Sequence, residues 1–109
     1  MIKAVFFKDK SGYYGFDVSG HAGYAEYGED IICAGVSSAL MLTANTITDF
    51  FGLKAQITQQ KNNIVLKVLN PDDADTADKL IASFKTHLDL VEDEYEGTIE
   101  VLVKETNRG

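Results

Sequence analysis

Two stretches near the start of the chain are apolar runs of the kind that forms strands. Residues 2 to 8 and 13 to 19 are rich in β-branched and aromatic side chains, and the turn-forming run D-K-S-G separates them. This pattern predicts a β-hairpin. Residues 54 to 60 and 63 to 69 repeat it around K-N-N, where asparagine tolerates the positive φ of a tight turn, and predict a second hairpin.

Two longer segments carry apolar residues at three- and four-residue intervals, the period of an amphipathic helix. The first runs from about residue 31 to 51, and Gly52 after it is typical of a helix C-terminus. Its apolar stripe consists of Ile32, Val36, Leu40, Ala44, Ile47 and Phe51. Cys33 falls within this stripe and is expected to be partly buried. Met41 and Leu42 lie outside the stripe, which favours a second packing partner and predicts a homodimer.

The second helix begins at N-P-D-D, where Asn70 can cap and Pro71 suits the first helical position. Its apolar stripe extends to about residue 91. Residues 98 to 103 alternate in polarity and predict a last strand, whereas the polar tail after them is expected not to pack. This second half of the chain thus contributes the second hairpin, a helix and a strand.

The element order is therefore strand, strand, helix, strand, strand, helix, strand. It predicts an α/β (α+β) fold in which one five-stranded mixed sheet is covered by two helices. With 109 residues and neither repeat nor linker, the chain is expected to form one domain, residues 1–109.

Charge and composition narrow the possible partners. The net charge of −7 argues against direct binding of nucleic acid, which needs clustered lysine and arginine. Acidic residues gather in residues 26–30, 72–78 and 89–96, which could steer a basic protein, although such runs are more often solvated faces. No apolar run approaches the roughly 18 residues of a membrane span, and no signal-peptide pattern occurs. A single cysteine suits a reducing compartment, so the cytoplasm is expected.

The candidate chemistry lies between Gly20 and Ser37. Asp30 as a helix cap would place Cys33 in the first turn, at the positive end of the helix dipole, where a thiolate is favoured. The glycine-rich loop before it is long enough to bring His21 back over the helix start as a base. The two residues form a candidate Cys-His dyad.

Simpler interpretations remain open at these positions. A lone cysteine near an apolar helix is often a small buried hydrophobe, and a histidine beside glycine is often a turn residue. His87 is an alternative base, but a histidine on a helix face is commonly a packing residue. One cysteine and two histidines fall short of a structural zinc set, so neither metal nor cofactor is expected.

The runs G-H-A at 20 to 22 and G-E-D-I-I-C-A-G-V-S at 28 to 37 resemble the signature of the ribosomal-processing cysteine proteases, the Prp family. The resemblance implies a cytoplasmic endopeptidase that removes a short N-terminal extension from a bacterial large-subunit ribosomal protein of the twenty-seven type. It assigns His21 as base and Cys33 as nucleophile, with the extended ribosomal-protein precursor as partner.

Neighbouring residues are assigned supporting roles in the same stretch. These residues are Gly20, Asp30, Ala34, Gly35 and Ser37. Asp30 could orient His21 or cap the helix, and the two roles compete for the same oxygens. Tyr24 and Tyr27 could cover a bound peptide or pack on the sheet edge. The non-catalytic alternative is a small acidic adaptor that binds a basic ribosomal protein.

Overall fold

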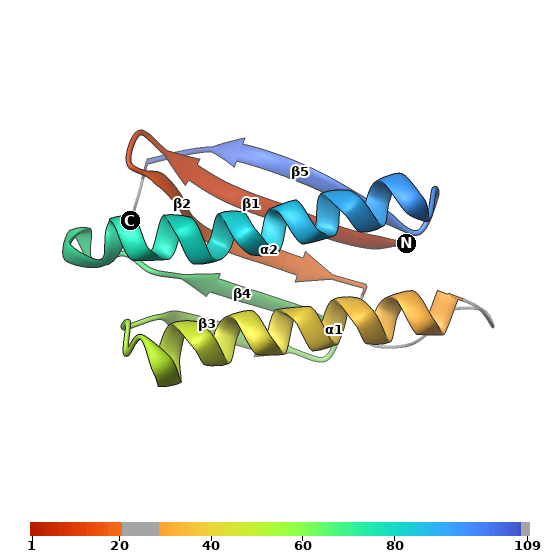
Figure 1. Cartoon of the computed structure of the whole chain (residues 1–109), viewed down its shortest axis with the longest axis horizontal. Coiled ribbons are helices and arrows are strands. Elements are labelled where there is room, and N and C mark those ends of the chain that lie inside the picture. The colour runs from red at the N-terminus through yellow and green to blue at the C-terminus, as the bar shows by residue number, and fades with distance from the viewer. Residues whose placement is uncertain (21–28, 108–109) are drawn as a thin grey trace.

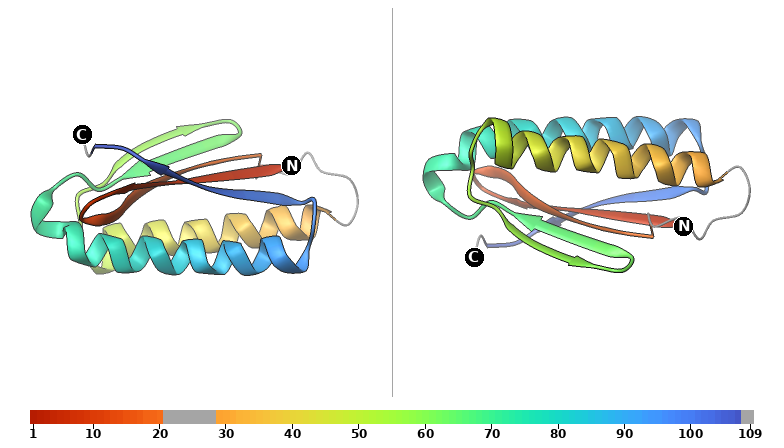
Figure 2. Two further views of the ribbon diagram at one scale, coloured as in Figure 1. Left: turned by 90° about the horizontal axis from the view of Figure 1, so that it is seen from above. Right: turned by 90° about the horizontal axis from the view of Figure 1, so that it is seen from below.

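The chain forms one mixed sheet with both helices on the same face (Figures 1 and 2). The computed structural model describes residues 1–20 and 29–107, and for residues 29 and 30 it describes the backbone alone. The strands are β1 (Ile2–Asp9), β2 (Gly12–Ser19), β3 (Gln56–Gln60), β4 (Asn63–Lys67) and β5 (Ile99–Glu105), in the spatial order β3-β4-β2-β1-β5. The helices are α1 (Glu29–Asn45) and α2 (Ala74–Glu94). Only the β1–β5 pair is parallel among these neighbours.

The predicted fold class and element order are confirmed. Both hairpins form, and β2 joins them by pairing with β4. One turn detail was wrong, because among the described residues no residue other than glycine has a positive φ. The K-N-N turn is therefore made without the left-handed asparagine that the sequence suggested.

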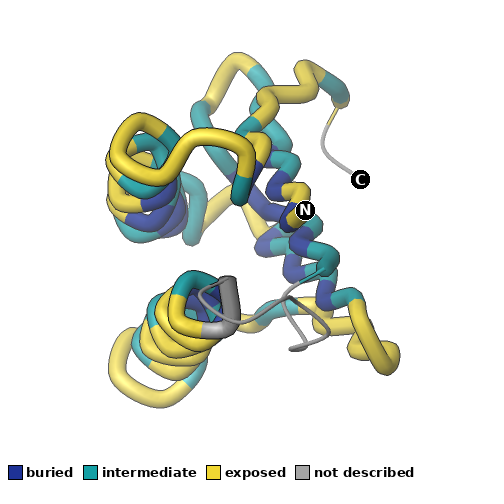
Figure 3. The backbone as a smooth tube through the Cα atoms, turned by 90° about the vertical axis from the view of Figure 1, so that its right-hand side faces the viewer, coloured by how far each residue is buried: buried dark blue, intermediate teal, exposed yellow. Residues whose placement is uncertain are grey.

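The hydrophobic core lies between the helices and the sheet face that they cover (Figure 3). Alternate residues of the strands point into it, including Ile2, Ala4, Phe6, Phe16, Val18, Leu66 and Ile99. Phe84 of α2 packs edge-on against two of these rings, with centroid distances of 5.6 Å to Phe6 and 5.0 Å to Phe16. From α1 the core receives Cys33, Val36 and Leu40. The predicted helix stripes thus define the packed faces.

The first helix ends differently from the prediction. After Asn45 it continues as a π-helical turn, η1 (Thr46–Phe50), in which Phe51 N–H donates to Thr46 O at 3.0 Å. The wider turn shifts the phase of the apolar stripe, so Phe51 is 55% exposed instead of buried. Gly52, with φ of +65°, ends the helix as predicted.

The second helix starts as its sequence indicates. Asn70 Oδ1 accepts a hydrogen bond from Asp72 N–H at 3.0 Å, and a short 3₁₀ turn, η2 (Pro71–Asp73), leads into α2. An asparagine side chain at this position satisfies an amide that has no partner within the helix. The cap assigned to Asn70 is therefore confirmed.

A bulge in the first hairpin corrects the prediction for the C-terminal tail. The β1–β2 register shifts between Phe7 and Lys8, and the Tyr14 ring stacks on Phe7, on the sheet face away from the helices. The Tyr14 hydroxyl hydrogen-bonds to the Thr106 hydroxyl, and Thr106 N–H donates to Lys8 O at 2.9 Å. Thr106 of the tail therefore packs on the sheet, and β5 extends to Glu105, two residues beyond the predicted strand.

The expectation that no stretch could span a membrane needs correction. Ile31–Phe50 is long and apolar enough by length and composition, with a mean hydropathy of 1.5. Such a helix is weak evidence for a span, because the core helix of a globular domain passes the same test. Here the helix also contributes Cys33, Val36, Leu40 and Ile47 to the core.

The aromatic contacts of Phe84 lead to a first prediction. Phe84→Ala should lower the free energy of unfolding by about 3–5 kcal/mol, because it opens a cavity between α2 and the central strands. Urea denaturation of the variant and the parent protein would measure the difference. Leu90→Ala, at a position 59% exposed on the same helix, should change it by less than about 0.5 kcal/mol. Similar losses in the two variants would contradict this assignment of the core.

Candidate active site

Cys33 lies in α1 and faces the end of the central strand β2. Its side chain is 5% exposed, more buried than the partial burial expected from the sequence. The thiol donates to the carbonyl oxygen of Gly20, with Sγ 3.9 Å from that oxygen. Gly20 directly follows β2, which ends at Ser19. The sulfur therefore joins the helix start to the end of the sheet.

Gly20 is held on three sides. Its N–H donates to Asn62 O in the β3–β4 turn at 3.1 Å, and its φ is +82°. A Cβ atom added there would lie 2.7 Å from Met1 O and 3.2 Å from the Cα of Ile2. Both the left-handed backbone and this close approach require glycine. Gly20 therefore fixes where the chain enters the segment that carries His21.

Helix α1 starts earlier in the sequence than predicted. The helix begins at Glu29, so Asp30 lies within its first turn and is not the cap. Position 30 still belongs to the first turn of the helix, where an acidic residue type is favoured by the dipole. Cys33 is the fifth helical residue and begins the second turn, whereas the first four N–H groups of a helix lack helical partners.

The remaining predicted site residues divide into three groups. His21, Tyr24 and Tyr27 lie outside the described residues, as does the side chain of Asp30. Ala34 and Gly35 are exposed, and a Cβ on Gly35 would meet nothing within 4 Å. Ser37 follows Cys33 by one turn and is partly buried. Of the predicted set, the structure therefore brings Gly20 and Cys33 into contact.

Two segments that contact Gly20 were not part of the predicted site. Met1 and Ile2 crowd Gly20 through the β1–β2 hairpin, in which Lys3 pairs with Ser19, and Asn62 O accepts a hydrogen bond from the Gly20 amide. The contact with Asn62 depends on the pairing of β2 with β4, which local sequence patterns do not encode. His87, the alternative base, is exposed on α2. Within residues 1–20 and 29–107, no three His, Cys, Asp or Glu side chains gather as a metal site requires.

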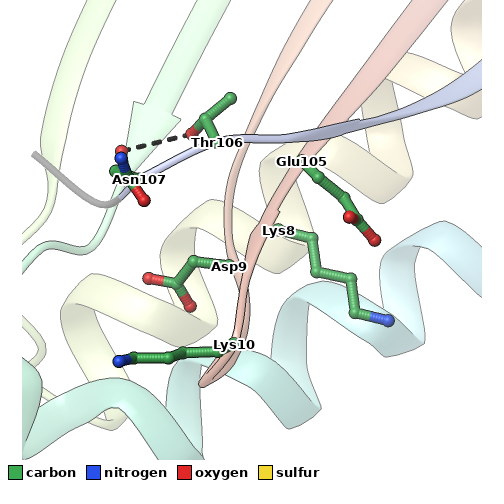
Figure 4. A pocket seen from close by; sticks show the side chains of 6 residues that line it. All are labelled: Lys8, Asp9, Lys10, Glu105, Thr106 and Asn107. Atoms are coloured by element: carbon green, nitrogen blue, oxygen red, sulfur yellow. Dashed lines mark hydrogen bonds between the residues drawn. The ribbon is translucent and has the colours of Figure 1, made fainter.

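A polar hollow lies at the other end of the sheet (Figure 4). Its walls come from the β1–β2 turn and the end of β5, and consist of Lys8, Asp9, Lys10, Glu105, Thr106 and Asn107. Figure 4 shows lysine and carboxylate side chains of opposite charge around it, and Thr106 Oγ1 donates to Asn107 O at 3.2 Å. These six residues include no cysteine or histidine, so the hollow offers neither a thiol nucleophile nor an imidazole base.

Comparisons with known proteins identify the family of the whole chain. The family model of cysteine protease Prp matches residues 1–100. A protein of Staphylococcus aureus named ribosomal processing cysteine protease Prp is 30% identical over 88 residues, which cover 80% of this chain and 83% of that protein.

Two solved structures share the fold. A Streptococcus mutans protein superimposes with a TM-score of 0.88 at 20% identity, covering 97% of this chain and 96% of its own. The essential ribosomal processing protease Prp of S. aureus, solved with a substrate peptide, gives a TM-score of 0.85 at 23% identity. That match covers 95% of this chain and all of the other.

The crowding at Gly20 leads to a second prediction. Gly20→Ala should lower the free energy of unfolding by at least about 1–3 kcal/mol, because the new Cβ forces a strained φ and meets Met1 O. Gly35→Ala is the matched control: its site is open and helical, so it should raise that energy by about 0.5–1 kcal/mol. Urea denaturation measures both. Equal stability of Gly20→Ala and the parent would show that Gly20 is not constrained in this way.

Proposed function

The chain belongs to the cysteine protease Prp family, and from this membership we propose that it removes a short N-terminal extension from a bacterial large-subunit ribosomal protein of the twenty-seven type. It is a cysteine-type endopeptidase, and its substrate is a polypeptide. The observation that carries the assignment of residues is the contact between Cys33 Sγ and Gly20 O. His21 is the next residue in the sequence, so its backbone nitrogen is bonded to the carbonyl carbon that the thiol approaches.

In the proposed reaction Cys33 is the nucleophile and His21 the base. His21 takes the thiol proton, and the thiolate attacks the scissile carbonyl carbon to form a tetrahedral oxyanion. Collapse of this intermediate breaks the C–N bond while the imidazolium gives its proton to the leaving amine. Water, deprotonated by His21, then attacks the thioester, and the acid product leaves with Cys33 restored as a thiol.

The start of α1 supplies favourable electrostatics for the oxyanion. The N–H groups of the first four helical residues have no helical partners and carry the positive end of the dipole. They are suited to bind the oxyanion that forms when Cys33, in the next turn, attacks the substrate. Asp30, in the first turn, has two competing roles in this proposal: it balances the helix dipole or it orients His21.

The buried thiol limits how a substrate enters. Attack needs a carbonyl carbon about 3–3.5 Å from the sulfur, yet Cys33 is 5% exposed and its Sγ contacts Gly20 O. Substrate must therefore replace the Gly20 contact before the bond is cut. Tyr24 and Tyr27 are the proposed contacts to an apolar, Phe-containing cleavage sequence. A basic ribosomal protein also suits the acidic end of α2, where Asp93, Glu94 and Glu96 are exposed.

The proposal includes a homodimer that covers the outer side of α1. No charged residue occurs between Ile31 and Thr48. The large apolar side chains on this side are exposed: Ile31 75%, Met41 61%, Leu42 69% and Phe50 83%. Apolar surface of this extent commonly marks an interface, and a second copy of the chain would cover the same surface on its partner. A cytoplasmic location completes the proposal, because the substrate is a ribosomal protein.

Removing either member of the dyad is a direct test of the catalytic assignment. Cys33→Ala and His21→Ala should each lower cleavage of an extended ribosomal-protein precursor by at least ~10³-fold, with an unchanged far-UV circular dichroism spectrum. Mass spectrometry of the products measures the cut. Cys33→Ala should still bind the uncut precursor, and His87→Ala is the matched histidine control that should cleave normally. Full cleavage by purified Cys33→Ala would leave the acidic adaptor as the remaining interpretation.

A charge placed on the outer side of α1 tests the dimer. Leu42→Glu should convert a dimer to a monomer in sedimentation velocity, because it buries an unpaired carboxylate in the interface. Leu90→Glu introduces the same charge at a similarly exposed position of α2 and should leave the dimer intact. A parent protein that sediments only as a monomer at micromolar concentration would rule out the homodimer.

A further inference from the structure

The two edges of the sheet are protected to very different degrees. The β5 edge carries Glu100, Lys104 and Glu105, and the outward N–H of Val101 donates to Glu92 Oε2 of α2 at 3.0 Å. The β3 edge has five exposed residues, Q-I-T-Q-Q, with no charge and no proline. Proteins usually block an exposed edge with lysine, proline or a bulge, because it otherwise pairs with another chain. The β3 edge is therefore open to an added strand.

The hydrogen-bond pattern identifies which backbone groups face outward. Gly20 N–H donates to Asn62 O and Val68 N–H donates to Tyr14 O, so the even-numbered residues of β4 face β2. Asn63, Val65 and Lys67 then face β3, opposite Gln60, Thr58 and Gln56. Because bonding alternates along a strand, the N–H and C=O of Ile57 and Gln59 point away from the sheet.

These outward groups have no partner that would compete with a peptide. Among residues 1–20 and 29–107, no hydrogen bond from outside the β3–β4 pair reaches the backbone of Ile57 or Gln59. The side chain of Ile57 is also 44% exposed and provides an apolar contact beside them. An extended segment could gain backbone hydrogen bonds here without matching a particular charge.

The register places this edge close to the candidate active site. Gln60 pairs with Asn63, which pairs with Ser19, the residue before Gly20. The end of β3 therefore lies at the same end of the sheet as Cys33. Strands are spaced about 4.8 Å apart, so an added strand would run roughly 14 Å from the line of β2. Four or five extended residues, at about 3.3 Å each, cover that distance.

We propose that the free edge of β3 binds an extended segment of the polypeptide substrate by strand addition, four or five residues from the scissile bond. This rests on the proposed protease function. The site recognises backbone and adds affinity, while the residues around Cys33 select the bond that is cut. A short peptide that spans only the cleavage point would reach Cys33 but not β3.

Binding to the Cys33→Ala protein tests the proposal without depending on cleavage. The probes are fluorescent precursor peptides of about twenty and about eight residues, both centred on the cleavage point. Gln59→Pro removes one outward amide and leaves the bonds to β4 in place. Gln59→Pro should lower the affinity for the long peptide by about three- to tenfold and leave the affinity for the short peptide unchanged. Gln59→Val, which loses the same side chain but keeps the amide, should retain the parent affinity.

Val103→Pro is the control on the opposite edge, where the N–H of Val103 also faces outward by alternation from Val101. This substitution should leave the affinity for the long peptide unchanged.

Alternate N-methylation of the long peptide is a second measurement that needs no altered protein. Only methyl groups that face β3 should weaken its binding. Equal affinity of Gln59→Pro and parent, or equal loss for both peptides, would overturn the proposal. So would a Gln59→Pro protein that changes from dimer to monomer, since the edge would then belong to a second copy.

Failure of the proposed function would give a different result. If the protein with Cys33 intact cuts neither peptide, the protease assignment to this substrate fails, whatever the binding data show. If it cuts both with the same KM, the protease assignment stands and the strand-addition site is rejected.

Discussion

Four elements meet at the backbone of Gly20, and the geometry of the candidate active site depends on this meeting. The amide of Gly20 binds the β3–β4 turn, its Cα faces the start of β1, and its carbonyl oxygen receives the thiol of α1. A residue without a side chain lets these parts approach within a few ångströms. The position of the sulfur is consequently fixed by backbone contacts, which are stiffer than contacts between flexible side chains.

Most of the local structure could be predicted because it follows from short-range chemistry. Apolar runs flanked by turn residues predicted the first four strands and alternation predicted the last, while the stripe through Ile81 and Phe84 identified the packed side of α2. Asn70 and Pro71 marked a helix start through the hydrogen bond that the structure contains. Cys33 and Gly20 were singled out from their place in one motif, and the two residues are in contact.

The predictions that were wrong concern features set by contacts between distant segments or by unusual turns. The contact of Tyr14 with Thr106 needs both a bulge in the first hairpin and the pairing of β1 with β5, two strands at opposite ends of the chain. Phe51 became exposed because a π-helical turn changed the phase of a regular stripe. Asp30 moved from cap to first turn through a shift of two residues in the helix start, which side-chain preferences alone do not resolve. The open edge of β3 was visible only once strand order was known.

The parallel pairing of β1 with β5 has a consequence for the order in which the sheet can form. Ile2 pairs with Ile99, so the first strand gains its second neighbour only after nearly the whole chain has been made. Contacts this distant in sequence form slowly, since a long loop must close before they contribute. Met1, which crowds Gly20, lies beside this late-forming pair. A nascent chain that lacks residues 99–105 therefore contains Cys33 and the first hairpin, but the outer edge of β1 is still without its partner strand.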